Sequence, residues 1–434
     1  MHERLLIVGT VPYNEMSTSR AFDAYFHFWE HENMAQVFSH TKTPCKGHCG
    51  TLFQITDQRI VKRWMGKKIE TGKEFMREDL PDAWENNTAE VDGQAMKKAY
   101  KFGTGHTPLT HLLRGILWRK RFWNTKKLNE WLDAFKPEAV FLAWSDDYFI
   151  LNIALYIAKK YNIPMIPCIG DDYYFNTRFS LNPFYWIYKS SYRRLVRKTL
   201  SYANSAFYIS DKIRDKYNTE FNLHGETVYL TSTVERRPFA PLNKENPVIT
   251  YFGNIRMGRN HSLSDIADAL REVNPAYKLE VYSGEKDETY TKVLSENPSI
   301  DFKGGVPYAE VRKRMAESDI TVIVEGFEKA DVDKSRYSLS TKAADALRSG
   351  CTILTYGSRE CGIVEYMEST EASFVCTEKA ELRATIERMF SADETRETYY
   401  EKQIQVTEAH HNLRSSTGTI ERIVTEEIAN HGKE

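Results

Sequence analysis

Short apolar runs alternate with helix-forming segments along most of this 434-residue chain. Leu5–Val8 and Ala139–Trp144 have the length and composition of buried strands, while residues 150–158 place apolar side chains on one face of a helix. Strands that alternate with helices in this way form parallel sheets with helices on both faces. The sequence therefore predicts an α/β fold of the doubly wound kind.

The alternation is interrupted once, at Glu235–Pro247, where three prolines stand among charged residues as in a linker. A chain of this length is expected to divide into domains of about 150–200 residues, because one hydrophobic core does not grow to that size. The expected divisions are an N-terminal domain, a C-terminal domain and a terminal helical segment at 1–240, 241–395 and 396–434. Residues 40–110 show no clear period, and we expect an insertion of mixed structure there.

The formal net charge of −1 gives no overall attraction to nucleic acid. Leu5–Val8 is too short for the apolar core of a signal peptide, and no stretch approaches the about 20 apolar residues of a membrane span. A cytoplasmic protein is therefore expected. Cys45 and Cys49 flank a Lys-Gly-His segment, but a structural zinc site needs four ligands and no second pair stands at a suitable spacing. No metal site is expected.

The turn Gly253–Arg259 follows a predicted strand at 248–252 and precedes a helix. Glycines allow a diphosphate to approach the backbone, the helix offers free N–H groups, and arginines can bind phosphate oxygens in pairs. The alternative is a surface turn with solvated arginines. The residues expected to act here are Gly253, Asn254, Arg256, Gly258 and Arg259.

A second segment with this chemistry is Ser340–Gly350. Ser340 can cap a helix and leave nearby N–H groups for phosphate, and Lys342 adds positive charge. Thr341 and Asp345 belong to the same expected site. For Asp345 the alternative is an ordinary carboxylate on an exposed helix face.

Three segments in order resemble motifs of the C-terminal domain of GT-B glycosyltransferases, and of the bacterial family 4 members that build cell-surface polysaccharides. They are Val248–Leu263, Phe302–Val311 and Ser340–Leu354. Phe135–Phe141 and Ile163–Tyr173 match the N-terminal domain more loosely. The resemblance implies two Rossmann-like domains facing a central cleft, with the C-terminal helix crossing back to the N-terminal domain.

The resemblance also implies a nucleotide-sugar donor, no further cofactor, no metal and retention of the anomeric configuration. It places Arg259 at a phosphate-binding position and Asp345 at the position of a ribose-binding acid, and it makes Lys303–Tyr308, with Val306, a loop beside the base. The family often has a second acid eight positions before Asp345, where this chain has Tyr337. The acids that could replace it are Glu325, Glu328, Asp331 and Asp333.

Acidic pairs follow two predicted strands of the N-terminal domain, at Asp146-Asp147 and Asp171-Asp172. Ligands of open α/β sheets bind beyond the carboxyl ends of the strands, so Asp146 and Asp171 are candidates to bind an acceptor or remove its proton. Two alternatives stay open: helix capping, since acids complement the helix dipole, and metal binding.

Two basic segments rich in aromatic residues, Leu113–Trp131 and Phe184–Leu200, complete the candidate surfaces. Such segments can lie on anionic membranes, which would suit a lipid-linked acceptor, and the alternative is a solvated helix face. Nucleic acid is not expected as a partner, because no recognised motif accompanies these charges.

The function predicted from the sequence is transfer of a sugar from a nucleotide-sugar to a hydroxyl of a saccharide or lipid-linked acceptor in cell-surface polysaccharide synthesis. Two alternatives remain open. One is a nucleotide-sugar epimerase or hydrolase on the same fold, and the other is a degenerate transferase that acts as a scaffold subunit.

Overall fold

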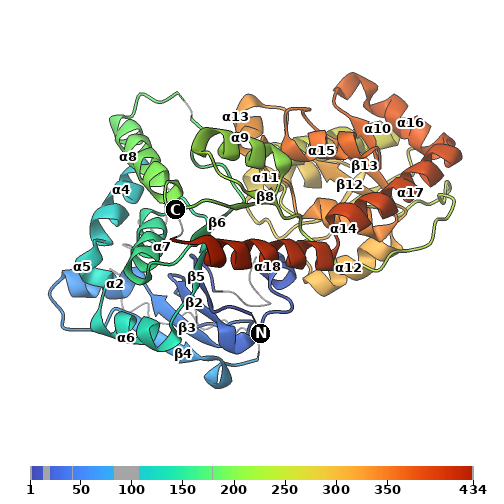
Figure 1. Ribbon diagram of the computed structural model, residues 1–434. Helices are drawn as coiled ribbons and strands as arrows, with labels where there is room; N and C mark the ends of the chain where they lie inside the picture. The colour runs from blue at the N-terminus through green and yellow to red at the C-terminus, as the bar shows by residue number, and fades with distance from the viewer. Residues whose placement is uncertain (1, 13–19, 42, 83–106, 178, 433–434) are drawn as a thin grey trace. The chain divides into compact units, whose positions relative to one another are not determined.

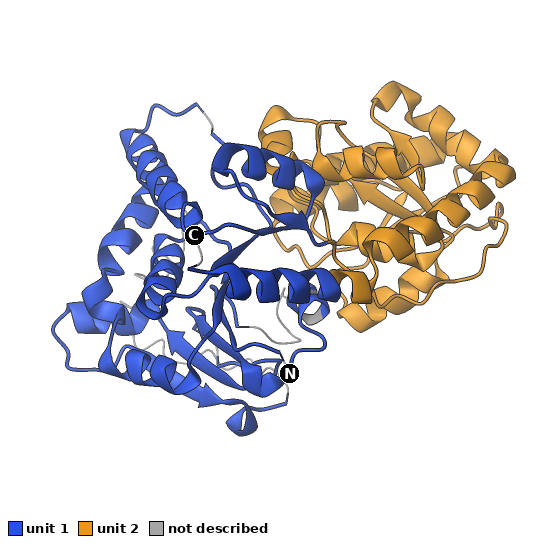
Figure 2. Cartoon of the chain, viewed as in Figure 1, with its two compact units in different colours: residues 1–228, 417–434 blue, residues 229–416 orange. Residues whose placement is uncertain are grey.

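The computed structural model describes residues 2–12, 20–41, 43–82, 107–177 and 179–432 (Figure 1). The chain forms two compact units, each with its own sheet (Figure 2). Unit 1 comprises Met1–Val228 and Thr417–Glu434, and unit 2 comprises Tyr229–Ser416. Both sheets are built mainly of parallel strands with intervening helices, which confirms the predicted α/β fold class.

The sheet of unit 1 has eight strands in the order β4-β3-β2-β1-β5-β6-β7-β8. All its neighbours pair in parallel except β3 and β4. The strands are β1 (Leu5–Val8), β2 (Met34–Phe38), β3 (Thr51–Ile55), β4 (Gly72–Met76), β5 (Ala139–Ala143), β6 (Met165–Ile169), β7 (Phe207–Tyr208) and β8 (Glu226–Thr227). The chain order reverses between β1 and β5, and such a switch point is where ligands of open α/β sheets bind.

The segment expected to be an insertion at 40–110 contributes directly to this sheet in its described part. β3 pairs in parallel with β2, and β4 returns antiparallel to β3. Between them lies α2 (Asp57–Trp64), an amphipathic helix that buries Gln58 and Ile60. The helix is short, half of its residues are charged, and Ile60 is its one buried apolar residue. In β3, by contrast, Leu52–Ile55 is fully buried.

Helices cover the faces of this sheet. Those described in unit 1 are α1 (Arg20–Tyr25), α2, α4 (Pro108–Leu117), α5 (Lys120–Trp123), α6 (Lys126–Phe135), α7 (Tyr148–Tyr161), α8 (Pro183–Leu200) and α9 (Asp211–Phe221). The last helix, α18 (Leu413–Asn430), begins in unit 2 and ends in unit 1, where Ile420, Ile423 and Val424 are buried. The predicted return of the terminal helix to the N-terminal domain is therefore confirmed.

The sheet of unit 2 has six parallel strands in the order β11-β10-β9-β12-β13-β14. The strands are β9 (Ile249–Phe252), β10 (Leu279–Tyr282), β11 (Ile300–Phe302), β12 (Ile320–Val324), β13 (Thr352–Tyr356) and β14 (Phe374–Cys376). The helices of this unit are α10 (Arg259–Val273), α11 (Glu288–Ser295), α12 (Tyr308–Glu317), α13 (Lys329–Ser335), α14 (Lys342–Ser349), α15 (Gly362–Thr370), α16 (Leu382–Ser391) and α17 (Asp393–His410). Here the switch point lies between β9 and β12, so the turns after these two strands meet.

The central strands β1, β9 and β12 are largely apolar and fully buried, as expected of strands covered on both faces. In unit 2 the core joins Tyr251 and Val281 of the sheet to Leu263 and Ile266 of α10. Among the described residues, no helix is long and apolar enough to span a bilayer.

Candidate functional site

The turn after β9 is shaped by two glycines with positive φ. Gly253 has φ +133°, and a Cβ there would lie 2.3 Å from Cε of Lys342. Gly258 has φ +73° and caps α10, and a Cβ there would lie 3.0 Å from Cα of Gly326. Both positions therefore require glycine, the first to admit a lysine side chain and the second to let the turns after β9 and β12 touch.

Arg259 is the first residue of α10 and forms a bidentate ion pair with Glu325, which directly follows β12. Its Nε donates to Oε2 at 3.1 Å, and its Nη2 donates to both carboxylate oxygens at 2.8 Å. Both side chains are buried, with 10% and 2% exposed. Burial alone would lower the pKa of Arg259, but Glu325 and Tyr251 raise it above its ordinary value, so the guanidinium stays charged.

Lys342 lies on the other side of the glycine turn. Its Nζ donates to the hydroxyl of Tyr251 at 2.7 Å and lies 4.6 Å from the centre of that ring. Burial of the ammonium group, with a further contribution from Arg259, lowers the pKa of Lys342 to about 7, whereas Glu325 acts in the opposite direction. The structure thus brings Arg259 and Lys342 together around Gly253, as a pair of cations with one shared counter-charge.

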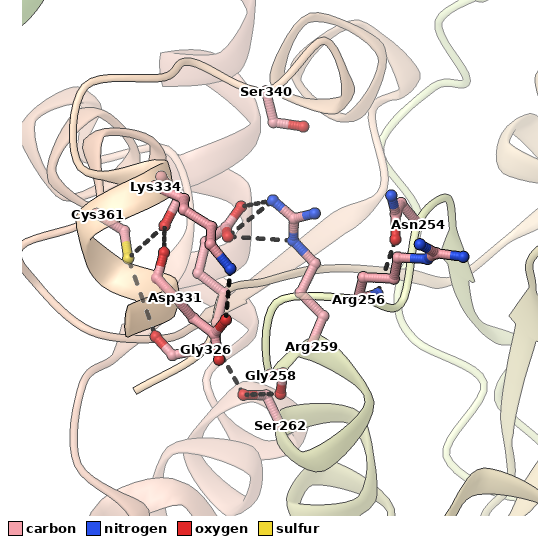
Figure 3. Close-up of polar contacts among 12 residues, drawn as sticks. Asn254, Arg256, Gly258, Arg259, Ser262, Gly326, Asp331, Lys334, Ser340 and Cys361 are labelled. Atoms are coloured by element: carbon pink, nitrogen blue, oxygen red, sulfur yellow. Dashed lines mark hydrogen bonds and ion pairs between the residues drawn. The ribbon is translucent and has the colours of Figure 1, made fainter. Parts of the chain in front are cut away.

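Arg256 takes a different direction from Arg259 (Figure 3). It forms a bidentate pair with Glu285, with Nη2 donating to Oε1 at 3.1 Å, and half of its side chain is exposed. The pair holds the pKa of Glu285 at about 2. Asn254 is exposed, and its side-chain oxygen accepts the backbone N–H of Arg256 at 2.7 Å. These two residues shape the outer rim of the turn.

Asp345 lies in the first turn of α14 and is 4% exposed. Its Oδ1 accepts hydrogen bonds from the hydroxyls of Ser232 at 2.6 Å and Tyr308 at 3.0 Å. The alternative of an exposed helix carboxylate is therefore wrong. Two hydroxyl donors on one carboxylate are the chemistry that a ribose would present, but here the protein supplies them.

The remaining residues predicted on this side surround the start of α14. Ser340 is part-buried and accepts the backbone N–H of Lys342 through Oγ at 3.4 Å, while Thr341 is exposed at the N-terminal boundary of the helix without a side-chain cap bond. Val306 is part-buried against a small cluster with Phe252 and Tyr282. It packs beside the carboxyl ends of β9 and β10.

The four acids that could replace the expected second acid have different surroundings. Asp333 pairs with Arg336 at 3.3 Å, and Asp331 lies 3.7 Å from Lys334. Glu328 is exposed. Of the four, Glu325 is the one bonded to Arg259. Sequence reasoning left it among several alternatives because its partner lies 66 positions away.

An open depression of about 810 Å³ adjoins the outer side of the turn, where Gly258 and Ser262 meet Phe327. Its walls carry three carboxylates, from Asp265, Glu328 and Asp331, against two permanently cationic side chains, Arg256 and Lys334. A diphosphate is better matched on the inner side, where Arg259 and Lys342 share the single carboxylate of Glu325.

In unit 1 the predicted acidic pairs follow β5 and β6, which pair in parallel. Asp147 is the residue before α7, is buried, and accepts Nη1 of Arg114 at 2.5 Å. Asp146 lies 3.6 Å from Nε2 of His111. Asp147 therefore anchors α4, and Asp146 is the more accessible of the two.

The second pair divides its roles in the same way. Asp172 organises its loop by accepting the backbone N–H groups of Tyr174 and Phe175 at 3.0 and 2.8 Å. Asp171 is exposed and accepts the hydroxyl of Tyr173 at 3.4 Å. Burial and the charges of Asp171 and Asp146 raise the pKa of Tyr173, so the structure brings both predicted carboxylates near this phenol.

The sequence indicated the segments that contain Tyr251, Tyr308 and Tyr173 but not the contacts of these residues, and it gave no indication of Ser232. A further partner is Lys189, which is buried on α8 and donates to the carbonyl of Tyr173 at 2.7 Å. Burial and Arg193 lower the pKa of Lys189 to about 8. These roles depend on contacts formed only in the folded chain.

No protein-family model and no curated protein sequence matches this chain. Solved structures are similar over its whole length. HepE of Anabaena, crystallised with UDP, has a TM-score of 0.58 at 11% identity, covering 98% of this chain and 100% of HepE. WaaG, a glycosyltransferase involved in lipopolysaccharide biosynthesis, has a TM-score of 0.56 at 11% identity, covering 97% and 99%. Sucrose-phosphate synthase of Thermosynechococcus elongatus has a TM-score of 0.58 at 9% identity, covering 99% and 100%. The chain therefore has the GT-B fold.

Proposed function

We propose that this protein is a glycosyltransferase that moves a sugar from a nucleotide-sugar to a hydroxyl of a saccharide or lipid-linked acceptor in cell-surface polysaccharide synthesis. The observation that carries the proposal is the pair of cations, Arg259 and Lys342, around Gly253 at the switch point of unit 2. Two similar structures support it: HepE was crystallised with UDP and with UDP-glucose, and WaaG acts in lipopolysaccharide biosynthesis.

In the proposed reaction the bond between the sugar and the diphosphate breaks, and negative charge develops on the leaving phosphate. Arg259 has Nε and Nη2 engaged by Glu325, which leaves Nη1 for a phosphate oxygen. Lys342 provides the second positive charge once it is protonated. Such preorganised cations stabilise the leaving group in a transition state, so we propose that no metal is required and that the configuration is retained.

We assign the acceptor to unit 1. Asp146 and Asp171 follow neighbouring parallel strands and both act on the hydroxyl of Tyr173. A carboxylate there can bind a sugar hydroxyl and accept its proton as the new bond forms. Asp171 is exposed and Asp146 is partly buried, whereas the carboxylates of Asp147 and Asp172 are engaged in holding α4 and the loop.

For Asp345 we propose a ribose-binding role that requires an exchange. The hydroxyls of Ser232 and Tyr308 occupy the carboxylate, and ribose hydroxyls would replace one or both. The exchange is close to neutral in hydrogen bonds, because one hydroxyl donor replaces another.

The test is incubation with UDP-, GDP- and ADP-sugars, with nucleotide release and Kd as readouts. We expect one base to bind and Arg259→Ala to weaken that binding at least tenfold, whereas Arg256→Ala, outside the cation pair, changes it less. The proposal fails if no nucleotide-sugar binds or turns over.

One observation favours the scaffold alternative. Tyr337 occupies the position of the expected second acid, and Glu325 engages most of the phosphate-binding edge of Arg259. A degenerate subunit would bind the donor without releasing nucleotide, and it would acquire activity only with a partner protein. Nucleotide release that needs no acceptor would instead indicate the hydrolase alternative, and conversion of the sugar with the nucleotide still attached would indicate the epimerase.

We further propose that the protein works in the cytoplasm, at an anionic membrane surface that presents a lipid-linked acceptor. The two basic segments predicted for this contact are α8 and the stretch from α4 to α6 of unit 1.

A further inference from the structure

Large apolar side chains are exposed together on one part of unit 1. In the loop before α8, Phe179 and Leu181 are 87% and 88% exposed. Phe184, Trp186 and Ile187, in the first turns of α8, are 44–55% exposed. On α4 the exposed apolar residues are Leu109, Leu113 and Ile116. Soluble monomers seldom expose so many large apolar side chains in one area without a binding role.

The two sets lie on neighbouring helices. Leu109, Leu113 and Ile116 are four and three positions apart, which places them on one side of α4. α4 lies beside α8, and the ring of His111 stacks on that of Tyr188 at 4.7 Å (Figure 1). We call the exposed apolar residues of these two helices and of the loop before α8 the α4–α8 face.

The same helices become basic toward their C-terminal ends. An open groove of about 680 Å³ lies there between α4, α7 and α8. Its lining includes Trp118, Arg119, Lys120, Tyr156, Lys159 and Lys198. Among the described residues, no carboxylate forms an ion pair with Arg119 or Lys198, while Lys160, also in the lining, is paired with Asp133 at 3.1 Å. The groove thus presents cations that lack counter-charges and is suited to phosphate groups.

We propose that the α4–α8 face binds the surface of an anionic bilayer, with its apolar side chains at the hydrocarbon boundary and the cations of the groove on lipid phosphates. The inference deepens the membrane association in the proposed function and rests on it. Apolar side chains next to basic side chains are the composition of a membrane-surface site, because the first enter the hydrocarbon boundary and the second attract anionic lipids. A protein partner would instead need acidic side chains placed opposite the five basic side chains of the groove.

The face is also joined to the candidate acceptor site. Phe179 follows Asp171 by eight positions, and α8 holds the intervening loop through Lys189, which donates to Tyr173, and Arg193, whose Nε donates to the carbonyl of Tyr174 at 3.0 Å. A lipid-linked sugar held at the bilayer surface would therefore lie on the same element that positions the acceptor carboxylate.

The test is flotation of the full chain with vesicles of phosphatidylcholine, alone or with about one third phosphatidylglycerol. We expect binding to the anionic vesicles that weakens with salt. The double variants Phe179→Ser/Leu181→Ser and Arg119→Ser/Lys198→Ser should each reduce it about tenfold or more. Trp64→Ser/Met65→Ser removes two other exposed apolar residues, which lie 58% and 63% exposed at the end of α2, and should leave the binding unchanged.

Nucleotide-sugar binding is measured on the same samples, and the flotation variants should retain it, because none of their residues belongs to the donor site. If the unaltered chain binds no nucleotide-sugar, the proposed function is wrong. If it binds a nucleotide-sugar but does not float with the vesicles, only the proposed role of the α4–α8 face is wrong. The proposed role of the face is also wrong if both variants float like the unaltered chain. It is wrong too if the variants abolish a dimer seen by light scattering, which would make the face an interface between copies, or if RNA displaces the vesicles, which would make it a nucleic-acid site.

Discussion

Arg259 and Glu325 illustrate how a single residue pair sets the charge of the donor site. A buried bidentate pair is satisfied in itself and attracts an anion less than a free guanidinium would. A diphosphate next to Nη1 of Arg259 is attracted by the guanidinium and repelled by the nearby carboxylate of Glu325. If the proposed donor site is correct, Glu325 is expected to lower the affinity for the donor while it keeps the arginine stable and oriented.

Glu325→Gln is expected to lower the free energy of unfolding by about 3–5 kcal/mol, because it leaves the buried charge of Arg259 without its partner. The same change should tighten UDP-glucose binding severalfold, since the freed guanidinium pairs with the diphosphate. Chemical denaturation and calorimetric titration measure the two effects. Glu328→Gln, in the same loop but exposed, should change neither, and weaker donor binding in Glu325→Gln would show that orientation of Arg259 outweighs charge.

Lys342 makes donor binding dependent on pH. Its pKa of about 7 means that the amine is largely neutral above that pH in the free protein, whereas a bound diphosphate favours the ammonium form. Binding therefore takes up a proton, and the affinity for UDP-glucose should fall as pH rises above 7, by up to about tenfold per pH unit. Lys342→Gln should bind more weakly but without this slope. If the affinity of both proteins changes equally with pH, a group other than Lys342 is responsible for the pH dependence.

The same shift affects stability in a defined direction. The pKa of Lys342 is lower in the folded chain than in the unfolded one, so the unfolded chain binds more protons between the two values. The loss of unfolding free energy caused by burying the Lys342 ammonium is complete below pH 7, and it is relieved as pH rises toward the ordinary pKa of lysine. The difference in unfolding free energy between the unaltered chain and Lys342→Gln isolates this contribution.

At the scale of elements, the start of α10 depends on a residue without a side chain. Gly258→Ala would place a Cβ 3.0 Å from Gly326 and 3.1 Å from the carboxylate of Asp331, at φ +73°. We expect a loss of about 1–3 kcal/mol in unfolding free energy, measured by urea denaturation. Gly418→Ala, in α18 with no neighbouring atom within 4 Å, should instead stabilise the chain by up to about 1 kcal/mol. Equal effects at both positions would contradict a special role for Gly258.

The elements of both sheets could be predicted where apolar runs are long enough to show a period. β9 was expected at 248–252 and lies at Ile249–Phe252. β4 and α2 were not recognised, because β4 at the sheet edge exposes most of its residues and α2 buries little apolar surface. β3 is well buried but was missed together with these two weakly buried neighbours.

The candidate donor site was predictable as positions but not as contacts. Glycines and cations near strand ends indicated Gly253, Arg259 and Lys342. The sequence could not show that Lys342 reaches Tyr251 or that Glu325 engages Arg259, because those contacts depend on which strands become neighbours at the switch point. Whether these residues bind a donor stays a prediction.

At the scale of the whole molecule, α18 makes the stability of unit 1 depend on the far end of the chain. Thr417 donates to the carbonyl of Ala24 at 3.0 Å, and Arg422 pairs with Glu226 at 2.6 Å. Ile420→Ala should lower the stability of unit 1 by about 2–5 kcal/mol, because the side chain is fully buried. Calorimetry should show the transition of unit 1 shifting down while that of unit 2 is retained. Ile116→Ala, at an exposed position, is the matched control, and a uniform shift of both transitions would contradict the assignment.

The two places where the chain passes between units are tied to each other. Val228 is followed by Tyr229 and Ser416 by Thr417, and the hydroxyl of Ser416 donates to the carbonyl of Tyr229 at 3.0 Å. Unit 2 is thus one continuous segment, Tyr229–Ser416, whose two ends are hydrogen-bonded to each other and which is inserted between the two segments of unit 1. A segment of this kind can be exchanged, deleted or expressed separately without cutting any strand of the host sheet. Variation in unit 2 can therefore proceed without redesign of the sheet of unit 1.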